Sequence, residues 1–343
     1  MIRGQRSLGG RIHIFLRRNT KMQCLEVGTT DNEKPQMKKR HRPRLLPLLV
    51  GVLFVFGFVG GFINGYSFGI DDNQRNKLLS SIYLHLPQAA SAETAHTDVC
   101  NTFTPVLRAS LSNSEYIVYD ALVDSVSQFS PQSSFSLPSP TTVSMERIVE
   151  ITKIVLNEPE LYWLESISWI TWTDNQDGTR TYTVKIDYNM DAEERCSTQK
   201  AIEAVVGPIL EEADCHSAKE AAEYVNNYLA SSVSYMRDKV HQTEHPYDMI
   251  TGPLLTKQAI CSGYAKTFTY LMARLGYPSA YCLGYTKEGV YHAWNAIRDG
   301  DTILYTDSTF NASDPFDERW LNLSRDDFDS HQETQKFWYE PTI

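Results

Sequence analysis

The fold is organised around residues 258–276, which read QAICSGYAKTFTYLMARLG. Apolar residues recur there at the spacing of a helix, and Gly276 is typical of a helix end. Ser262 and Gly263 suit the narrow first turn, so the helix is expected to begin at Cys261. At a helix N-terminus the macrodipole favours a thiolate, and unpaired backbone N–H groups can bind an oxyanion. The stretch therefore predicts a nucleophilic cysteine.

A nucleophilic cysteine needs a base and a group that orients the base, and both residue types follow along the chain. Residues 291–297 and 302–306 read as two strands joined by a short polar turn. His292 lies in the first strand and Asp307 directly follows the second. A hairpin would set these two side chains next to each other, so the sequence predicts a triad of Cys261, His292 and Asp307.

Three motifs carry a resemblance to a known family: Cys-x-Gly-Tyr-Ala at 261–265, His-Ala-Trp-Asn at 292–295 and Asp-Ser-Thr at 307–309. In order and spacing they resemble the core of the transglutaminase-like superfamily, over about residues 220–315. The resemblance implies an α+β, papain-like fold, in which the cysteine-bearing helix packs on an antiparallel sheet that carries the histidine and the aspartate. It also implies the same triad.

The chain departs from the larger calcium-dependent transglutaminases, because its sequence has no acidic loop with the spacing of calcium ligands. It is more similar to the short, membrane-attached bacterial members of the superfamily. We expect no cofactor and no metal.

The resemblance implies that the thiolate of Cys261 attacks a carboxamide or peptide carbonyl and forms a thioester. The acyl group would then pass to an amine or to water. Three functions stay open: acyl transfer on a protein or peptide of the cell envelope, a cysteine peptidase or amidase acting on protein or cell-wall peptides, and a non-catalytic binding module that keeps the fold. No nucleic-acid partner is expected.

Four further residues are candidates for the site. The backbone N–H of Cys261 supplies one expected oxyanion donor, and Tyr247 and Gln258, in the preceding loop, are candidates for the second. Tyr264 and Trp294 are candidate substrate-binding residues because they lie within the motifs.

A rival motif, His-x-x-Glu-His, occurs at residues 241–245 and has the form of a zinc-peptidase signature. Pro246 disfavours helical geometry at the second histidine, and no third ligand follows at helical spacing. A polar loop leading to the active site is the favoured interpretation.

The charge of the chain is divided along its length. Residues 1–44 hold 12 of the chain's 32 Lys and Arg but 3 of its 42 Asp and Glu. The remainder therefore holds 20 basic and 39 acidic residues. Residues 45–70 contain no charged side chain, and they exceed the roughly 20 residues that span a bilayer core. The basic residues before them predict a cytoplasmic tail at 1–44, a single transmembrane signal anchor at 45–70 and an extracellular catalytic domain.

The alternative is a cleaved signal peptide. Residues 90–92 read Ala-Ser-Ala, the small-x-small form of a cleavage site, and Met37 would be a plausible start. This site lies some twenty residues beyond the apolar run, so the uncleaved anchor is favoured.

The region after the anchor divides into a spacer at 71–97, an N-terminal α+β domain at 98–190 and the catalytic domain at 191–343. In the N-terminal domain the sequence predicts helices at 115–126, with Ser114 as N-cap, and at 144–156, a Ser/Pro-rich linker at 129–142, and strands at 163–173 and 181–188. In the catalytic domain it predicts helices at 192–213 and 218–231, the second opened by a capping box at Ser217.

The cysteine count allows disulfides outside the cell. If Cys261 is the free nucleophile, Cys100, Cys196, Cys215 and Cys282 remain beyond the membrane for up to two bridges. The candidate pairs are Cys196 with Cys215, or Cys100 with either of them.

Overall fold

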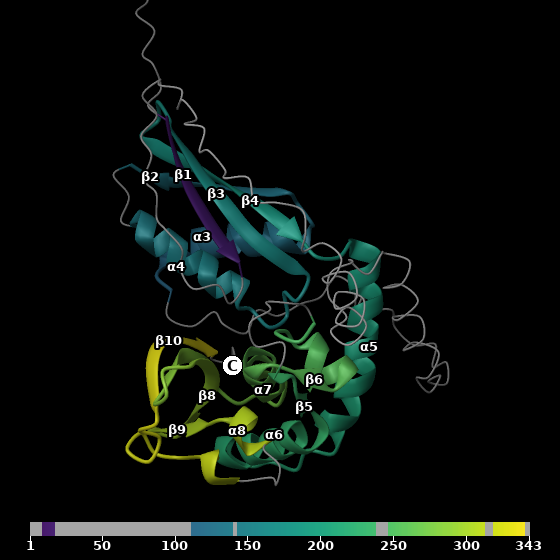
Figure 1. Cartoon of the computed structure of the whole chain (residues 1–343). Helices are drawn as coiled ribbons and strands as arrows, with labels where there is room; N and C mark the ends of the chain where they lie inside the picture. Colours follow the sequence, from purple (N-terminus) through teal and green to yellow (C-terminus); the bar gives the residue numbers. More distant parts are fainter. Residues whose placement is uncertain (1–8, 18–110, 140–142, 238–245, 313–317, 340–343) are drawn as a thin grey trace, which may run out of the picture. The chain divides into compact units, whose positions relative to one another are not determined.

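Two four-stranded antiparallel sheets with helices packed against them make up the fold (Figure 1). This arrangement agrees with the predicted α+β class. The structure is a computed structural model, and it describes residues 9–17, 111–139, 143–237, 246–312 and 318–339.

Several predictions concern residues outside these ranges. They are the transmembrane segment 45–70, the spacer 71–97, the cleavage site 90–92 and the His-x-x-Glu-His motif 241–245. Within the described ranges, no helix combines the length and the apolar character that crossing a membrane requires.

The first sheet belongs to the N-terminal α+β part of the chain. In spatial order its strands are β1 (Gly9–Arg17), β3 (Leu164–Asp174), β4 (Thr179–Tyr188) and β2 (Gln132–Pro138). Helices α3 (Asn113–Ser127) and α4 (Met145–Leu156) lie against this sheet (Figure 1), and their buried apolar side chains belong to the same core as those of the sheet. The predicted helices and the β3–β4 hairpin are thus confirmed.

Two predictions in this region are wrong. The expected linker at 129–142 contains β2, which the Ser/Pro-rich composition hid, although Phe135 and Leu137 alternate with exposed residues as in a half-buried strand. The N-cap of α3 is Ser112 rather than Ser114, because Ser112 stands three residues before Glu115. That spacing permits the reciprocal capping box, in which the Ser112 backbone N–H donates to the Glu115 carboxylate at 2.7 Å.

Strand β1 falls in the segment that the charge pattern assigns to a cytoplasmic tail. It pairs with β3 antiparallel, with Arg11 opposite Thr171 and Leu16 opposite Ile167. Two hydrogen-bonded strands must lie on the same side of a membrane. The pairing and a single crossing at 45–70 therefore exclude each other, and the structure places residues 9–17 with the N-terminal α+β domain.

The second sheet carries the predicted hairpin. Its spatial order is β10 (His331–Tyr339), β7 (Ser279–Thr286), β8 (Tyr291–Asp299) and β9 (Thr302–Thr306). Helix α7 (Cys261–Arg274) contacts β7 and β8, where Tyr281 and Ala293 share its hydrophobic core. The β8–β9 hairpin and the start of the helix at Cys261 are confirmed, whereas β7 and β10 were not predicted.

Helices α5 (Ala192–Glu211) and α6 (Ala218–Ser232) agree with the predicted helices. The Ser217 hydroxyl accepts the Glu220 backbone N–H, as the capping box requires. A bidentate ion pair between Arg274 and Glu203, at 2.8 and 2.9 Å, joins α7 to α5. Between α6 and α7 run the π-helical turn η2 (Gly252–Thr256) and the short parallel strands β5 (Ser234–Tyr235) and β6 (Gln258–Ala259).

The position of β1 is tested by a disulfide engineered between facing residues. In the full chain, mild oxidation of an Arg11→Cys/Thr171→Cys variant should link the two positions, because they are partners across β1 and β3. Peptide mass mapping measures the link. An Arg11→Cys/Ser136→Cys variant is the matched control, since β2 lies at the opposite edge of the sheet. If the first variant does not link, and protease added to intact cells leaves residues 1–44 uncleaved, a single crossing of the membrane at 45–70 would be favoured.

Candidate active site

Helix α7 begins at Cys261, with Ile260 as its N-cap. The Ile260 backbone N–H donates to the Tyr247 carbonyl at 3.0 Å, which fixes the entry of the chain into the helix. Gly263 makes this approach possible, because a Cβ at that position would lie 2.2 Å from the Tyr247 carbonyl oxygen. Cys261 itself is a free thiol and partly exposed. The nucleophile candidate thus stands at a fixed and accessible helix N-terminus.

The last residue of the His-Ala-Trp-Asn motif holds this helix on the sheet. The Asn295 side-chain amide, buried on β8, donates to the Ala265 carbonyl at 2.9 Å and to the Ala280 carbonyl at 3.1 Å. One bond reaches α7 and the other reaches β7. Because Asn295 and His292 belong to one strand, this contact sets the distance between the helix with Cys261 and the strand with His292.

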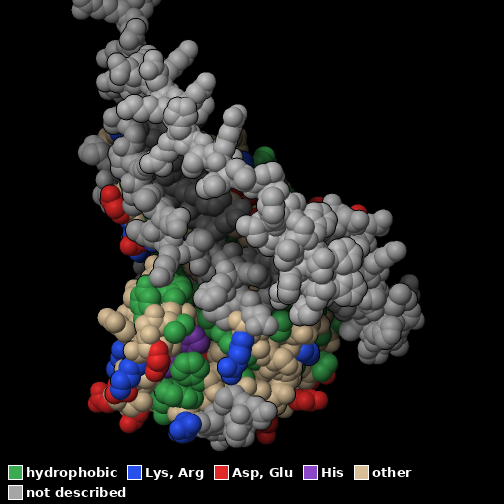
Figure 2. Space-filling view, viewed as in Figure 1, with side chains coloured by type: hydrophobic (Ala, Val, Ile, Leu, Met, Phe, Trp, Pro, Cys, Tyr) green, Lys and Arg blue, Asp and Glu red, His purple; other side chains and the backbone are tan. Residues whose placement is uncertain are grey.

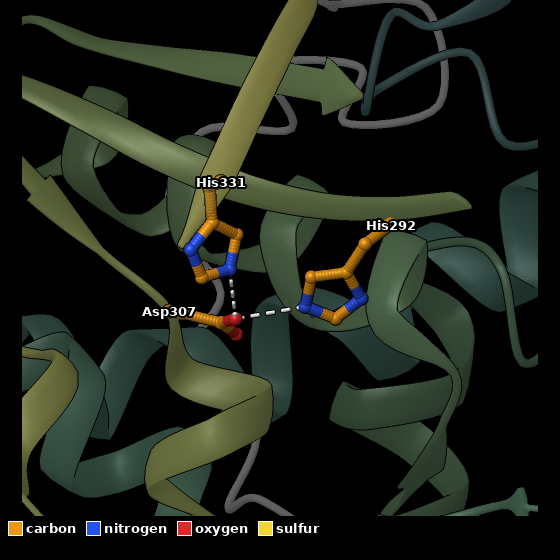
Figure 3. Close-up of side chains that lie close together, drawn as sticks. All are labelled: His292, Asp307 and His331. Atoms are coloured by element: carbon orange, nitrogen blue, oxygen red, sulfur yellow. Dashed lines mark hydrogen bonds and ion pairs between the residues drawn. The ribbon is translucent and has the colours of Figure 1, made fainter. Parts of the chain in front are cut away.

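His292 and Asp307 are in direct contact, as Figure 3 shows. The Nε2 atom of His292 lies 2.7 Å from Oδ2 of Asp307, and both side chains are buried. Asp307 ends the hairpin predicted from the sequence, so the expected neighbourhood of the two residues is confirmed. Since Nε2 binds the carboxylate, Nδ1 is the imidazole nitrogen that is left for Cys261.

Burial and charge act in opposite directions on the two groups. Burial by itself lowers the pKa of His292, but the negative charge of Asp307, the hydrogen bond to it and the interaction of the imidazolium with the Cys261 sulfur raise that pKa to about 10. Burial by itself raises the pKa of Asp307, but the charge and hydrogen bond of His292, with those of a second histidine, His331, hold the pKa well below its usual value. The arrangement favours an imidazolium–carboxylate pair beside the thiol.

Asp307 has further partners. It is the N-cap of the short helix α8 (Ser308–Asn311), where Oδ1 accepts the backbone N–H groups of Thr309 at 3.0 Å and Phe310 at 3.1 Å. Its own backbone N–H donates to the Trp320 carbonyl at 2.8 Å. The two bonds to Oδ1 hold the carboxylate, and the backbone bond holds the segment of chain that carries it.

The second histidine was missed by the sequence analysis. His331, the first residue of β10, lies with Nε2 at 3.1 Å from the same Oδ2 atom that His292 contacts (Figure 3). It stands in no motif. The signal that was present is a weak one: residues 331–339 are rich in Thr, Phe, Trp and Tyr and would read as a strand.

Aromatic rings enclose the imidazole–carboxylate cluster. His292 stacks on Phe310 at a centroid distance of 4.8 Å, and His331 stacks on Phe328 at 4.1 Å. Trp294 and Trp320 complete the enclosure with edge contacts to His331. Such surroundings keep water from the charged pair and strengthen its electrostatic interaction.

The other candidate residues lie in different places from those expected. Tyr264 is fully buried, and its hydroxyl donates to the Val233 carbonyl, so it supports the fold instead of facing a substrate. Trp294 is also fully buried, as part of the aromatic enclosure. Tyr247 contacts the helix start through its backbone carbonyl. Gln258 lies in β6 and pairs with Ser234 of β5. An oxyanion role for Tyr247 or Gln258 stays a prediction.

The cysteines divide into one bonded residue and three free ones among those described. Cys196 is disulfide-bonded, whereas Cys215, Cys261 and Cys282 are free. Of the candidate pairs, Cys196 with Cys215 is therefore wrong, whereas the expectation that Cys261 stays outside any disulfide is confirmed. Burial raises the pKa of the Cys282 thiol well above its usual value, so this thiol is inert. Cys100 lies outside the described residues.

His292, Asp307 and His331 are also close enough to bind a metal ion, since their ligand atoms lie within 4.8 Å of one another. The nitrogen–oxygen distances of 2.7 and 3.1 Å are those of hydrogen bonds, which explain the cluster without an ion.

At the molecular surface, Figure 2 shows histidine atoms among hydrophobic side chains on the part of the molecule built by the second sheet.

Comparison with known proteins shows what this part of the chain is similar to. Residues 208–321 match the profile of the transglutaminase-like superfamily. No curated protein sequence matches the chain.

Three solved structures are similar to parts of the chain. The crystal structure of a TGase has 18% identity and a TM-score of 0.30; the match covers 38% of this chain and 41% of that one. A candidate cysteine protease of Cytophaga hutchinsonii has 12% identity, coverage of 49% and 62%, and a TM-score of 0.30. LapG of Legionella pneumophila has 12% identity, coverage of 43% and 78%, and a TM-score of 0.32. The match spans less than half the length of the TGase.

The helix start can be tested at Gly263. A Gly263→Ala substitution should lower the free energy of unfolding by about 1–3 kcal/mol, because the added methyl group would overlap the Tyr247 carbonyl oxygen. Urea unfolding measures the change. Gly207→Ala in α5 is the matched control: its Cβ would meet no atom within 4 Å, so it should be neutral or stabilising. Equal effects of the two substitutions would contradict the close approach.

The raised pKa of His292 predicts how stability depends on pH. Its contribution is fully present below the ordinary pKa of 6.5 and is lost as the pH rises toward about 10. The contribution of Asp307, whose pKa is lowered, is present above its ordinary value of 3.8 and is lost below it. The free energy of unfolding should therefore fall between pH 6.5 and 10, and more steeply than in a His292→Gln variant. Parallel curves for the two proteins would refute the coupling.

Proposed function

We propose that this chain is a cysteine acyl-transfer enzyme acting on protein or peptide substrates, and the match of residues 208–321 to the transglutaminase-like superfamily supports the proposal. The observation that carries the proposal is the buried 2.7 Å contact between His292 and Asp307, together with the interaction of Cys261 with the same imidazole, which helps to raise the His292 pKa. The three residues take the roles of nucleophile, base and orienter.

In the first half of the proposed reaction, Cys261 and His292 start as a thiolate–imidazolium pair, with the thiol proton already on Nδ1, and the sulfur attacks a carboxamide carbon. The carbonyl electron pair moves to oxygen, which the backbone N–H groups at the start of α7 stabilise. When the tetrahedral intermediate collapses, the carbon–nitrogen bond breaks. His292 returns the proton to the leaving nitrogen, and a thioester remains on Cys261.

In the second half, an acceptor attacks the thioester. A primary amine, or water, gives its proton to His292 while its nitrogen or oxygen bonds to the acyl carbon. The carbon–sulfur bond then breaks, and the sulfur leaves as a thiolate beside the His292 imidazolium, which restores the starting pair. Asp307 stabilises the imidazolium in both halves and holds the ring with Nδ1 toward the sulfur.

A second candidate function, hydrolysis of an amide or peptide, uses the same first half. The aromatic rings surround His292 and His331 and protect the charged pair with Asp307. Whether an amine or water reaches the thioester therefore depends on the surroundings of Cys261. Membrane attachment through residues 45–70, and hence a cell-envelope substrate outside the cell, is proposed from the sequence alone. The engineered disulfide between β1 and β3 tests whether such an attachment can be a single crossing.

The acyl-transfer reaction is tested on the full chain with a glutamine-containing protein such as casein and a labelled primary amine. The wild type should incorporate label, and Cys261→Ala should abolish incorporation without loss of the folded circular-dichroism signal. His292→Ala should reduce the rate by about 10²–10⁴-fold, the usual contribution of a general base. Released ammonia or peptide fragments without incorporated amine would instead identify the hydrolase.

The matched control is Cys215→Ala, since Cys215 is the other free and partly exposed cysteine among the described residues. Burial and the negative charges of Glu220 and Asp214 raise the pKa of Cys215, so iodoacetamide should label Cys261 first near neutral pH. Activity that survives Cys261→Ala but not Cys215→Ala would refute the assignment of the nucleophile.

A further inference from the structure

His331 makes a contact that the triad does not use. Oδ2 of Asp307 lies 2.7 Å from Nε2 of His292 and 3.1 Å from Nε2 of His331, so one carboxylate oxygen is held between two imidazoles. The other oxygen accepts the backbone N–H groups of Thr309 and Phe310. The carboxylate is thereby fixed at both oxygens.

Removing the bond from His331 would change the direction in which the Asp307 carboxylate is held. The two N–H groups of α8 could be satisfied by either carboxylate oxygen, so they do not alone decide the rotation of the group. The bond from His331 pulls Oδ2 toward β10 while His292 pulls it toward β8. The orientation of Asp307, and through it that of the His292 ring, is therefore set by both histidines.

His331 is itself held by several contacts. Its Nδ1 atom lies 2.9 Å from the Ser330 hydroxyl, and its ring stacks on Phe328 with an interplanar angle of 14°. In the tautomer with the proton on Nε2, Nδ1 accepts from Ser330 and Nε2 donates to Asp307. Each polar atom of the ring then has a partner, which suits a residue that is almost fully buried.

The sheet brings His331 to this place. β10 pairs with β7, whose other neighbour is β8, and Gly284 lies opposite His292 in that pairing. A Cβ on Gly284 would lie 2.0 Å from the Gln332 carbonyl oxygen, so this glycine permits the close approach of β10 beside His331. The profile match ends at residue 321, before this strand begins.

From these contacts we propose that His331 is a positioning residue, which acts through Asp307 to keep the imidazole of His292 aligned with Cys261. The inference rests on the proposed function, because alignment matters only if His292 activates the thiol. His331 does not touch the reacting atoms.

The test measures alkylation of Cys261 by iodoacetamide at pH 7 in the full chain, which needs no substrate. His331→Phe keeps a ring to stack on Phe328 but removes the donor, and it should slow alkylation about 10- to 100-fold, as expected for one hydrogen bond to a charged group. His331→Gln offers a side-chain N–H in place of Nε2 and should recover most of the rate. His216→Gln, at an exposed histidine, is the control and should not change it.

A double-mutant cycle separates positioning from packing. If His331 acts through Asp307, His331→Phe should have no further effect on alkylation in an Asp307→Asn background. Additive losses, or equal losses in His331→Phe and His331→Gln, would overturn the proposal. Circular dichroism confirms the fold of each variant. If His331→Phe unfolds, the test uses His331→Gln alone, and its alkylation rate must then match that of the wild type.

The same assay distinguishes this inference from the proposed function. If His292→Ala does not slow alkylation, the triad itself is wrong. If His292→Ala slows it and His331→Phe does not, the triad stands and only the role of His331 fails.

Discussion

The negative charge of Asp307, buried without contact to solvent, is the constraint on which the site depends. A buried carboxylate is strongly unfavourable unless it is paired and hydrogen-bonded. Here two imidazoles and two backbone N–H groups satisfy it, and they come from β8, β10 and the start of α8. The sheet order meets the same requirement, because it brings the histidines of β10 and β8 to one carboxylate.

Helix α7 meets this cluster from the other side. Asn295 bonds α7 to β8 and β7, and Gly263 lets the Tyr247 carbonyl close against the first turn. Neither residue needs to take part in chemistry. They set where the Cys261 thiol stands relative to His292, which explains why a motif around a nucleophile includes a glycine and an asparagine.

The sequence predicts those parts of the site that local patterns encode. A helix start at Cys261 and a hairpin that joins His292 to Asp307 are short-range features, and both are confirmed. His331 could not be found in this way, because its contact with Asp307 depends on how the last strand pairs in the sheet. Composition misled at β2, where serine and proline conceal an alternating strand. Tyr264 is buried, since membership of a motif does not distinguish scaffold from surface.

The place of β10 after the other elements of the site affects the order in which the site can form during synthesis. A ribosome completes the Cys261 helix and the β8–β9 hairpin before it reaches residue 331, so the nascent chain holds a cysteine and a histidine while the Asp307 carboxylate still lacks its second imidazole. Pairing of β10 with β7 joins segments far apart in sequence, and such contacts form late. If His331 positions Asp307 as proposed, the thiol is therefore aligned by a late folding step, after the cysteine helix and the hairpin have been made.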